Sequence, residues 1–289
     1  MINNPIIMHI NYFEQGQSIE YVCRNAAKLG FDGIEFRRTG KNKSSEEYVG
    51  EIAKYANEYN IKYVLFGGPG IEMMTQDESK RKSEIESYKH FLDVASANLK
   101  LSVINFMTGW LNTRSASKYD EMGSFCAENW HWESAADGCQ QVADYAVKIG
   151  SDVKFAFETH MGYVHDIAGS SKKLCDMIDR PNFGINLDYG NTVYFSNETI
   201  EQAIDNCGDK LFYTHMKNSA PVAGMAYPGR IPTSLSGGDI NHRAYLNKLE
   251  AVGFDGLIGI EAPRPGDREW FAKEDLDYIK TVIADINFN

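Results

Sequence analysis

Clusters of basic residues are nearly absent from this sequence of 289 residues. Asp and Glu number 40 against 29 Lys and Arg, so the formal net charge is −11. The one basic cluster, Lys80-Arg81-Lys82, is short. A nucleic-acid-binding surface needs such clusters to displace counterions from phosphates. We therefore expect no nucleic-acid partner, and instead a small neutral or anionic substrate held in a local site.

Long apolar runs and paired cysteines are missing as well. No run approaches the roughly 20 residues that span a bilayer, and residues 1–7 have no basic stretch before an apolar core. The five cysteines are dispersed, odd in number and free of any Cys-x-x-Cys pair, which argues against a disulfide framework or a zinc knuckle. We expect no membrane partner and a reducing, cytoplasmic location.

The sequence does contain a regular alternation of short apolar runs and amphipathic segments. Strands are expected at 6–10, 33–36, 61–66, 101–106, 153–158, 183–188, 211–215 and 256–261. Helices are expected at 19–29, 45–56, 77–98, 134–149, 171–178, 198–207, 240–252 and 273–286, with Ser18 and Ser45 as the first two caps. The turn Gly67–Gly70 is expected to end the third strand.

Eight strand–helix units in alternation predict parallel strands joined by right-handed crossovers. The fold class is therefore α/β, and eight units fit a closed (β/α)8 TIM barrel that forms a single domain over residues 1–289. A doubly wound open sheet is the alternative, but no Gly-x-Gly-x-x-Gly follows the first strand. Two long segments without a clear period, 109–133 and 219–238, are expected to be loops at the barrel mouth.

Four successive expected strands end in a residue that can bind a metal: Glu158, Asp188, His215 and Glu261. All strand C-termini of such a barrel face one mouth, so these side chains are expected to converge there. Buried carboxylates are costly unless paired or bound to a cation. Three carboxylates and one imidazole suit Mn²⁺, with Mg²⁺ or Co²⁺ as alternatives. The competing interpretation is four ordinary ion pairs or helix caps.

Around these residues the chain resembles the sugar phosphate isomerase/epimerase superfamily of xylose isomerase-like TIM barrels, and the resemblance covers nearly the whole chain. It is strongest in the segments 157–162, 184–191, 214–218 and 237–241. The resemblance implies that Glu158, Asp188, His215 and Glu261 are the metal ligands, and that Glu158 and Glu261 are also the catalytic residues that move protons.

The resemblance implies a divalent-metal-dependent sugar isomerase or epimerase. Such an enzyme removes a proton next to a carbonyl, through an enediolate that the metal stabilises. The ketose epimerases carry a His where this chain has Asn191, and an Arg near the metal His where it has Lys217. These departures favour, as the alternative, a lyase or dehydratase that acts on an inosose or a 3-keto-glycoside by β-elimination. An endonuclease IV-like enzyme and a non-catalytic chain that needs a partner subunit remain open, as does a homo-oligomer.

Further residues are expected to contact a small sugar or polyol-ketone substrate: His160, Asn191, Lys217, Glu35 and Trp110, with His9 as another candidate. His160 is alternatively a loop histidine bonded to backbone, and Lys217 alternatively pairs with Glu35 or Asp239. Trp110, Trp130 and Trp132 either form an aromatic wall or pack on the barrel. His165 and Asp166 are expected to order their loop, and His90 and His242 to be solvated on helices.

Overall fold

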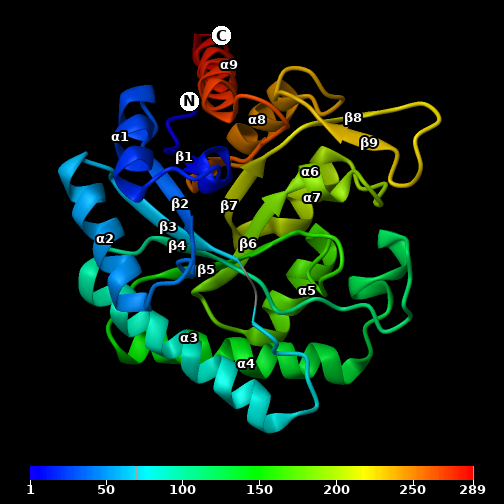
Figure 1. Ribbon diagram of the computed structural model, residues 1–289. Helices are drawn as coiled ribbons and strands as arrows, with labels where there is room; N and C mark the ends of the chain where they lie inside the picture. Colours follow the sequence, from blue (N-terminus) through cyan, green and yellow to red (C-terminus); the bar gives the residue numbers. More distant parts are fainter. Residues whose placement is uncertain (69–70, 289) are drawn as a thin grey trace.

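Eight parallel strands close into a barrel in the computed structural model, which describes residues 1–68 and 71–288 (Figure 1). Around the ring the order is β1-β10-β7-β6-β5-β4-β3-β2. The predicted TIM barrel is therefore confirmed. Pro69 and Gly70 of the expected turn after the third strand lie outside the described residues. The strands are β1 (Ile6–His9), β2 (Gly33–Arg37), β3 (Tyr63–Gly67), β4 (Val103–Phe106), β5 (Lys154–Glu158), β6 (Phe183–Asp188), β7 (Leu211–Met216) and β10 (Leu257–Ile260).

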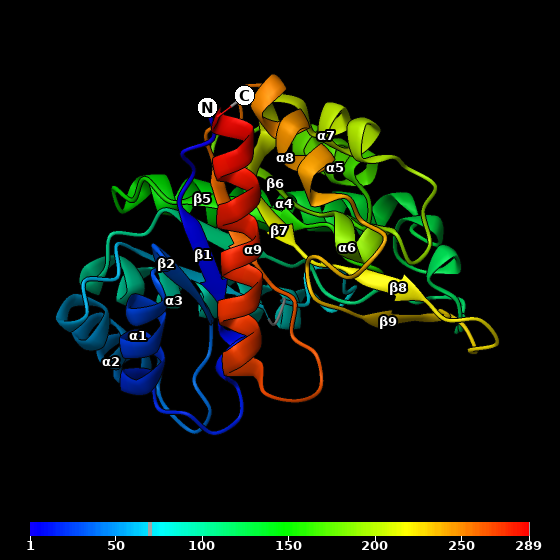
Figure 2. The same ribbon diagram turned by 90° about the horizontal axis from the view of Figure 1, so that it is seen from above.

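Helices surround the barrel and cover its outer face (Figures 1 and 2). None of the described helices combines the length and the apolar character needed to cross a membrane. The helices are α1 (Ile19–Leu29), α2 (Ser45–Glu58), α3 (Glu78–Asn98), α4 (Asn129–Lys148), α5 (Ala168–Ile178), α6 (Tyr189–Thr192), α7 (Ile200–Cys207), α8 (His242–Ala251) and α9 (Arg268–Phe288).

Local capping explains most helix boundaries, including those that the sequence pattern misplaced. Ser18 caps α1 as predicted, because its side chain accepts from the backbone N–H of Tyr21. The cap of α2 is Ser44 and not Ser45, because Ser44 forms a capping box with Glu47. Helix α4 begins at Asn129, five residues before the expected start at 134, with Glu128 as its cap. The Trp-rich first turn of α4 has no apolar period, so the sequence pattern does not reveal it as part of the helix.

The segment 219–238 is more ordered than predicted. It contains a short antiparallel hairpin, β8 (Ser219–Pro221) and β9 (Arg230–Pro232), where an irregular loop was expected. The hairpin projects sideways from the barrel in both views (Figures 1 and 2). Its strands are only three residues long and rich in Pro, so they carry no alternating apolar pattern that the sequence could have revealed.

Inward-facing residues change from apolar to polar along the barrel axis. At the N-terminal ends of the strands they form an apolar cluster of Ile7, Leu65, Val103, Ala156, Tyr213 and Leu257. Residues two positions further along the same strands face the same side. On β4, β5 and β7 these are Asn105, Glu158 and His215, all buried. A larger apolar cluster fills the space between strands and helices. The barrel thus presents a buried polar layer at its C-terminal mouth.

Candidate metal and substrate site

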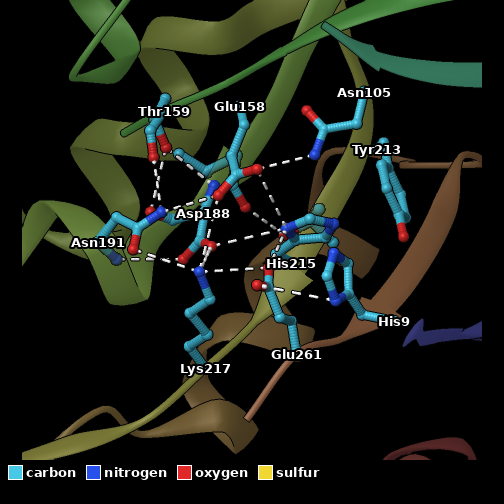
Figure 3. A network of polar contacts seen from close by, with 12 residues as sticks. His9, Asn105, Glu158, Thr159, Asp188, Asn191, Tyr213, His215, Lys217 and Glu261 are labelled. Atoms are coloured by element: carbon cyan, nitrogen blue, oxygen red, sulfur yellow. Dashed lines mark hydrogen bonds and ion pairs between the residues drawn. The ribbon is translucent and has the colours of Figure 1, made fainter. Parts of the chain in front are cut away.

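The four strand-end residues Glu158, Asp188, His215 and Glu261 converge at the barrel mouth (Figure 3). One ligand atom from each lies within 4.8 Å of the others, and all four residues are buried. His215 Nδ1 is 2.8 Å from Glu261 Oε2, 3.6 Å from Asp188 Oδ2 and 3.9 Å from Glu158 Oε2. The structure thus brings together the residues predicted as ligands.

Glu35 fixes the orientation of the His215 ring. Its Oε2 lies 2.8 Å from His215 Nε2 and also accepts a hydrogen bond from Tyr213 at 2.8 Å. Because this carboxylate binds Nε2, the other ring nitrogen, Nδ1, faces the cluster. Glu35 has no exposed surface. Its expected contact with substrate is therefore not present, and contacts with side chains of the barrel interior replace it.

Both glutamates of the cluster are held by side-chain amides. Glu158 Oε2 accepts from Asn105 at 2.7 Å, and its Oε1 accepts from Asn191 at 3.0 Å. Glu261 Oε1 accepts from Asn11 at 2.9 Å. These amide N–H groups stabilise the ionised form of each carboxylate and fix its direction.

Lys217 reaches into the centre of the cluster. Its Nζ lies 2.7 Å from Asp188 Oδ2, 3.2 Å from Glu261 Oε2 and 3.6 Å from Glu158 Oε1. The alternative prediction for Lys217, an ion pair with Glu35 or Asp239, is therefore wrong. Asp239 pairs with Arg230 instead, because the hairpin draws Arg230 over that carboxylate.

The charges of the site do not balance without a further cation. Four buried carboxylates, those of Glu35, Glu158, Asp188 and Glu261, lie in one polar layer. Among the described residues, Lys217 is the one Lys or Arg that pairs with any of them. Burying uncompensated charge is costly. A bound divalent cation would supply the missing positive charge.

Three atoms that face the cluster make close ionic contacts but no hydrogen bond of acceptable geometry within the described chain: Asp188 Oδ2, His215 Nδ1 and Glu261 Oε2. Buried polar atoms without a well-formed hydrogen bond are uncommon and call for a ligand. One imidazole nitrogen and carboxylate oxygens form a donor set suited to Mn²⁺, Mg²⁺ or Co²⁺. The residues present therefore fit a divalent metal ion.

Neighbouring charges keep the two glutamates ionised. Burial alone would raise the pKa of Glu158, but Lys217 and His215 outweigh it and lower the pKa to about 2. Burial likewise opposes ionisation of Glu261, yet His9, Lys217 and His215 hold its pKa well below the usual range. Both side chains are therefore carboxylates at neutral pH, which is the form that binds a metal or accepts a proton.

A cleft of about 360 Å³ opens directly above Glu158 and Glu261. His9, Arg37, His160 and Lys217 are among its lining residues. His160, one of the expected substrate contacts, lines this cleft, and its Nδ1 lies 2.9 Å from the carbonyl oxygen of Met161. The bond to backbone is therefore present, and the substrate contact stays a prediction.

The three tryptophans of segment 109–133 lie in different surroundings. Trp110 is 48% exposed and packs edge-on against Tyr163, beside the cleft and not in its lining. Trp132 is buried in α4, with Lys173 Nζ 3.8 Å from its ring centre, and Trp130 stacks on His131. Packing on the barrel therefore describes Trp132.

The predictions for the remaining histidines and for Asp166 are correct in part. His165 and Asp166 do order their loop: His165 Nδ1 binds the carbonyl oxygen of Glu158, and Asp166 accepts from the Ser124 N–H. His90 is exposed as expected. His242 is buried, which contradicts the expected solvated position, because the first turn of α8 packs towards Tyr278 of α9.

Sequence reasoning missed several polar residues of the site: Asn11, Asn105, Thr159 and Tyr213. Thr159 binds both backbone groups of Asp188 through its hydroxyl. Asn105 and Tyr213 stand inside apolar strand runs, at inward positions of the alternation. A polar residue inside an otherwise apolar strand was the available signal.

Comparisons with known proteins agree with this geometry. A family model described as xylose isomerase-like TIM barrel matches residues 23–282. Fructoselysine 3-epimerase of Escherichia coli O157:H7 is 22% identical over 241 residues, which covers 78% of this chain and 82% of that protein.

Many solved structures share the fold. D-psicose 3-epimerase in the presence of D-fructose aligns with a TM-score of 0.76 at 17% identity, over 96% of this chain and 99% of that one. The 3-keto-D-glucoside 4-epimerase YcjR of E. coli gives 0.74 at 15%, over 96% and 99%. The probable 3-DHS dehydratase AsbF of Bacillus anthracis gives 0.73 at 16%, over 96% and 98%.

Proposed function

The chain belongs to the xylose isomerase-like TIM barrel family, and on that premise we propose that it is a divalent-metal-dependent sugar isomerase or epimerase. The observation that carries the proposal is the buried cluster of Glu158, Asp188, His215 and Glu261, three of whose ligand atoms lack a well-formed hydrogen bond, beneath an open cleft. The similar fructoselysine, psicose and keto-glucoside epimerases support a keto-sugar as the substrate class.

The cluster residues would hold the ion, which we take to be Mn²⁺ with Mg²⁺ or Co²⁺ as alternatives. A divalent cation there polarises a carbonyl and stabilises negative charge that develops beside it. The rest of the chemistry belongs to the side chains. Glu158 and Glu261 both line the cleft and are both ionised, so one can remove a proton next to the carbonyl while the other returns it.

Lys217, Asn191 and His160 complete the site. Lys217 lines the cleft, where its ammonium group can donate to a substrate hydroxyl or to a developing oxyanion. Asn191 works through its neighbours: its amide donates to Glu158, and Lys217 donates to its carbonyl oxygen at 3.3 Å. We therefore assign Asn191 as a positioning residue, and His160 as a hydroxyl contact at the rim.

A lyase acting by β-elimination is the second candidate. Lys217 lies within 3.6 Å of all three carboxylates of the cluster. An ammonium group so placed can also donate a proton to a departing hydroxyl or glycosyl oxygen. The similar fold of a probable dehydratase agrees with this chemistry. A nuclease has less support, because the described residues contain a single group of potential ligands and the chain is acidic.

The test combines metal analysis with proton exchange. Purified wild-type protein, Glu158→Gln and a surface control, Glu86→Gln, are compared for bound Mn, Co and Mg, and then for deuterium incorporation into keto-sugars, inososes and 3-keto-glycosides in deuterated water. We expect stoichiometric metal and exchange in wild type and control, and loss of both in Glu158→Gln. Absence of metal in the wild type, with no rise in melting temperature on adding Mn²⁺, would contradict the proposal.

A further inference from the structure

A second cavity of about 320 Å³ adjoins the cleft above the cluster. The two share Lys217 and Glu261 as lining residues, so they lie on either side of these two side chains. Each is within the size of an ordinary small-molecule site, on the order of 300–1,000 Å³. The barrel mouth therefore offers room for a ligand in two parts, only one of which sits over Glu158.

The second cavity differs from the first in its chemistry. The first is lined largely by polar and charged side chains. Much of the wall of the second is apolar or aromatic: Tyr119, Met161, Tyr194, Pro232, Ala262 and Pro263. Aromatic faces of this kind suit a ring that presents C–H groups or a π face.

Apart from the two tyrosines, four polar side chains line the second cavity: Lys217 and Glu261, which it shares with the cleft, and Asn191 and Asn218. The side chain of Asn218 is already fully bonded. Its amide donates to Leu235 and Ile240, and its oxygen accepts from Ser219 and Ile240. Asn218 is therefore structural. Asn191 is bonded to Glu158, Thr159 and Lys217. Polar recognition therefore falls to Lys217 and Glu261, next to the reacting centre, and the apolar and aromatic residues of the wall are left for apolar contact.

Both long mouth segments contribute to the wall of this cavity, Tyr119 from 109–133 and Pro232 from 219–238. The backbone N–H of Tyr119 donates to the hydroxyl of Tyr227 at 2.7 Å, and the two rings pack at 5.6 Å. The Arg230 guanidinium lies 5.8 Å from the ring centre of Tyr194 and is bonded to Ser219. These contacts hold both tyrosines of the wall in place, so the cavity is formed before a ligand enters.

We propose that this second cavity binds a second ring of the substrate, so that the enzyme acts on a keto-sugar joined to another sugar or an aryl group and not on a free monosaccharide. The reacting ring occupies the cleft above Glu158, and the linked ring packs against Tyr119 and Tyr194. This inference rests on the proposed function for the identity of the first ring. The cavity itself, with its aromatic wall, is independent of that assignment.

The test measures dissociation constants by calorimetry on the Mn²⁺-loaded protein. D-fructose is compared with the ketodisaccharides turanose, maltulose, lactulose and isomaltulose, and methyl 3-keto-glucoside with its phenyl counterpart. We expect at least one two-ring ligand to bind roughly tenfold more tightly than its one-ring partner. In Tyr119→Ala and Tyr194→Ala that ratio falls towards one. The exposed aromatic control Trp270→Ala, outside both cavities, keeps it.

Three possible results decide which of the two proposals stands. If no two-ring ligand binds more tightly than its partner, or if the gain survives both tyrosine variants, the second-ring inference is overturned, and exchange with free sugars would leave the proposed function standing. If the gain depends on Tyr194 but no ligand exchanges protons, the cavity holds and the proposed function fails. If none of these sugars binds, both are overturned.

Discussion

The carboxylate of Glu35 lies 2.8 Å from Nε2 of His215, and neither side chain has solvent access to that contact. Tyr213 and Asn105 also donate to Glu35, so the carboxylate is fixed from three sides. Burial alone would raise the pKa of Glu35, but the proximity of His215 outweighs it and keeps the pKa low. Glu35 therefore acts through the ring of His215, as a positioning residue for a ligand.

Glu35→Gln tests this relationship. The amide keeps the shape but removes the charge that orients and polarises the His215 ring, and partners of this kind typically change metal affinity by about 10–100-fold. We expect Mn²⁺ affinity to fall by that order in a competition titration with a chelating dye, with a circular dichroism spectrum like that of the wild type. The exposed control Glu86→Gln should bind as the wild type does. Unchanged affinity in Glu35→Gln would rule out the positioning role.

Lys217→Met separates metal binding from chemistry. Removing an ammonium group 2.7 Å from Asp188 Oδ2 removes repulsion against an incoming cation, so Mn²⁺ affinity should stay constant or rise. Proton exchange with the best substrate of the panel should fall at least ~100-fold, in the range expected for loss of an electrostatic or proton-transfer group. Lys248→Met, which removes a pair with exposed Asp205, is the matched control. Full exchange activity in Lys217→Met would refute its proposed role.

Gly190→Ala should damage the site by displacing Lys217. A Cβ at Gly190 would lie 2.3 Å from Lys217 Cβ and 3.3 Å from its Cα, and neither atom can move without a shift of the backbone directly after β7. We expect a loss of stability of about 1–3 kcal/mol in urea unfolding, together with reduced exchange.

Gly169→Ala provides the comparison for that substitution. Gly169 lies in α5 with open space around the added methyl group. Alanine there should be neutral or stabilising by up to about 1 kcal/mol. Equal stability of the two variants would contradict the close approach of Gly190 to Lys217.

The buried His242 predicts a pH dependence of stability. Burial lowers the pKa of His242 to about 4, and the backbone of Lys217 offsets this only in part. The folded protein thus keeps the ring neutral, whereas the unfolded chain protonates it near pH 6.5. The buried neutral ring of His242 therefore costs no stability above about pH 6.5. As the pH falls from there towards 4, protonation of the unfolded chain lowers the free energy of unfolding, by about 2 kcal/mol at pH 5.

His242→Leu removes that ionisation. Urea unfolding at pH 7 and pH 5 should show a smaller loss of stability on acidification in the variant than in the wild type. Other titrating groups are the same in both proteins, so the difference isolates His242. Parallel pH profiles would mean that His242 is exposed in solution.

Element type and order were accessible from local patterns. The eight apolar runs, each followed by an amphipathic segment, specified the barrel because parallel strands need crossover helices and eight units close a ring. Capping and the ends of irregular segments were less accessible. The start of α4 at Asn129 and the hairpin of Ser219–Pro221 with Arg230–Pro232 depend on side-chain hydrogen bonds and chain packing that no short-range period reveals.

The sequence by itself determined that Glu158, Asp188, His215 and Glu261 stand at neighbouring strand ends, because strand alternation and chain order decide which residues reach the mouth. It could not determine which groups surround them. Asn105 is separated from Glu35 by 70 residues and from Glu158 by 53, and only closure of the barrel brings their side chains together. Tertiary structure likewise directed Lys217 to the cluster, buried His242 and built the second cavity, because each depends on contacts between segments that are distant in the chain.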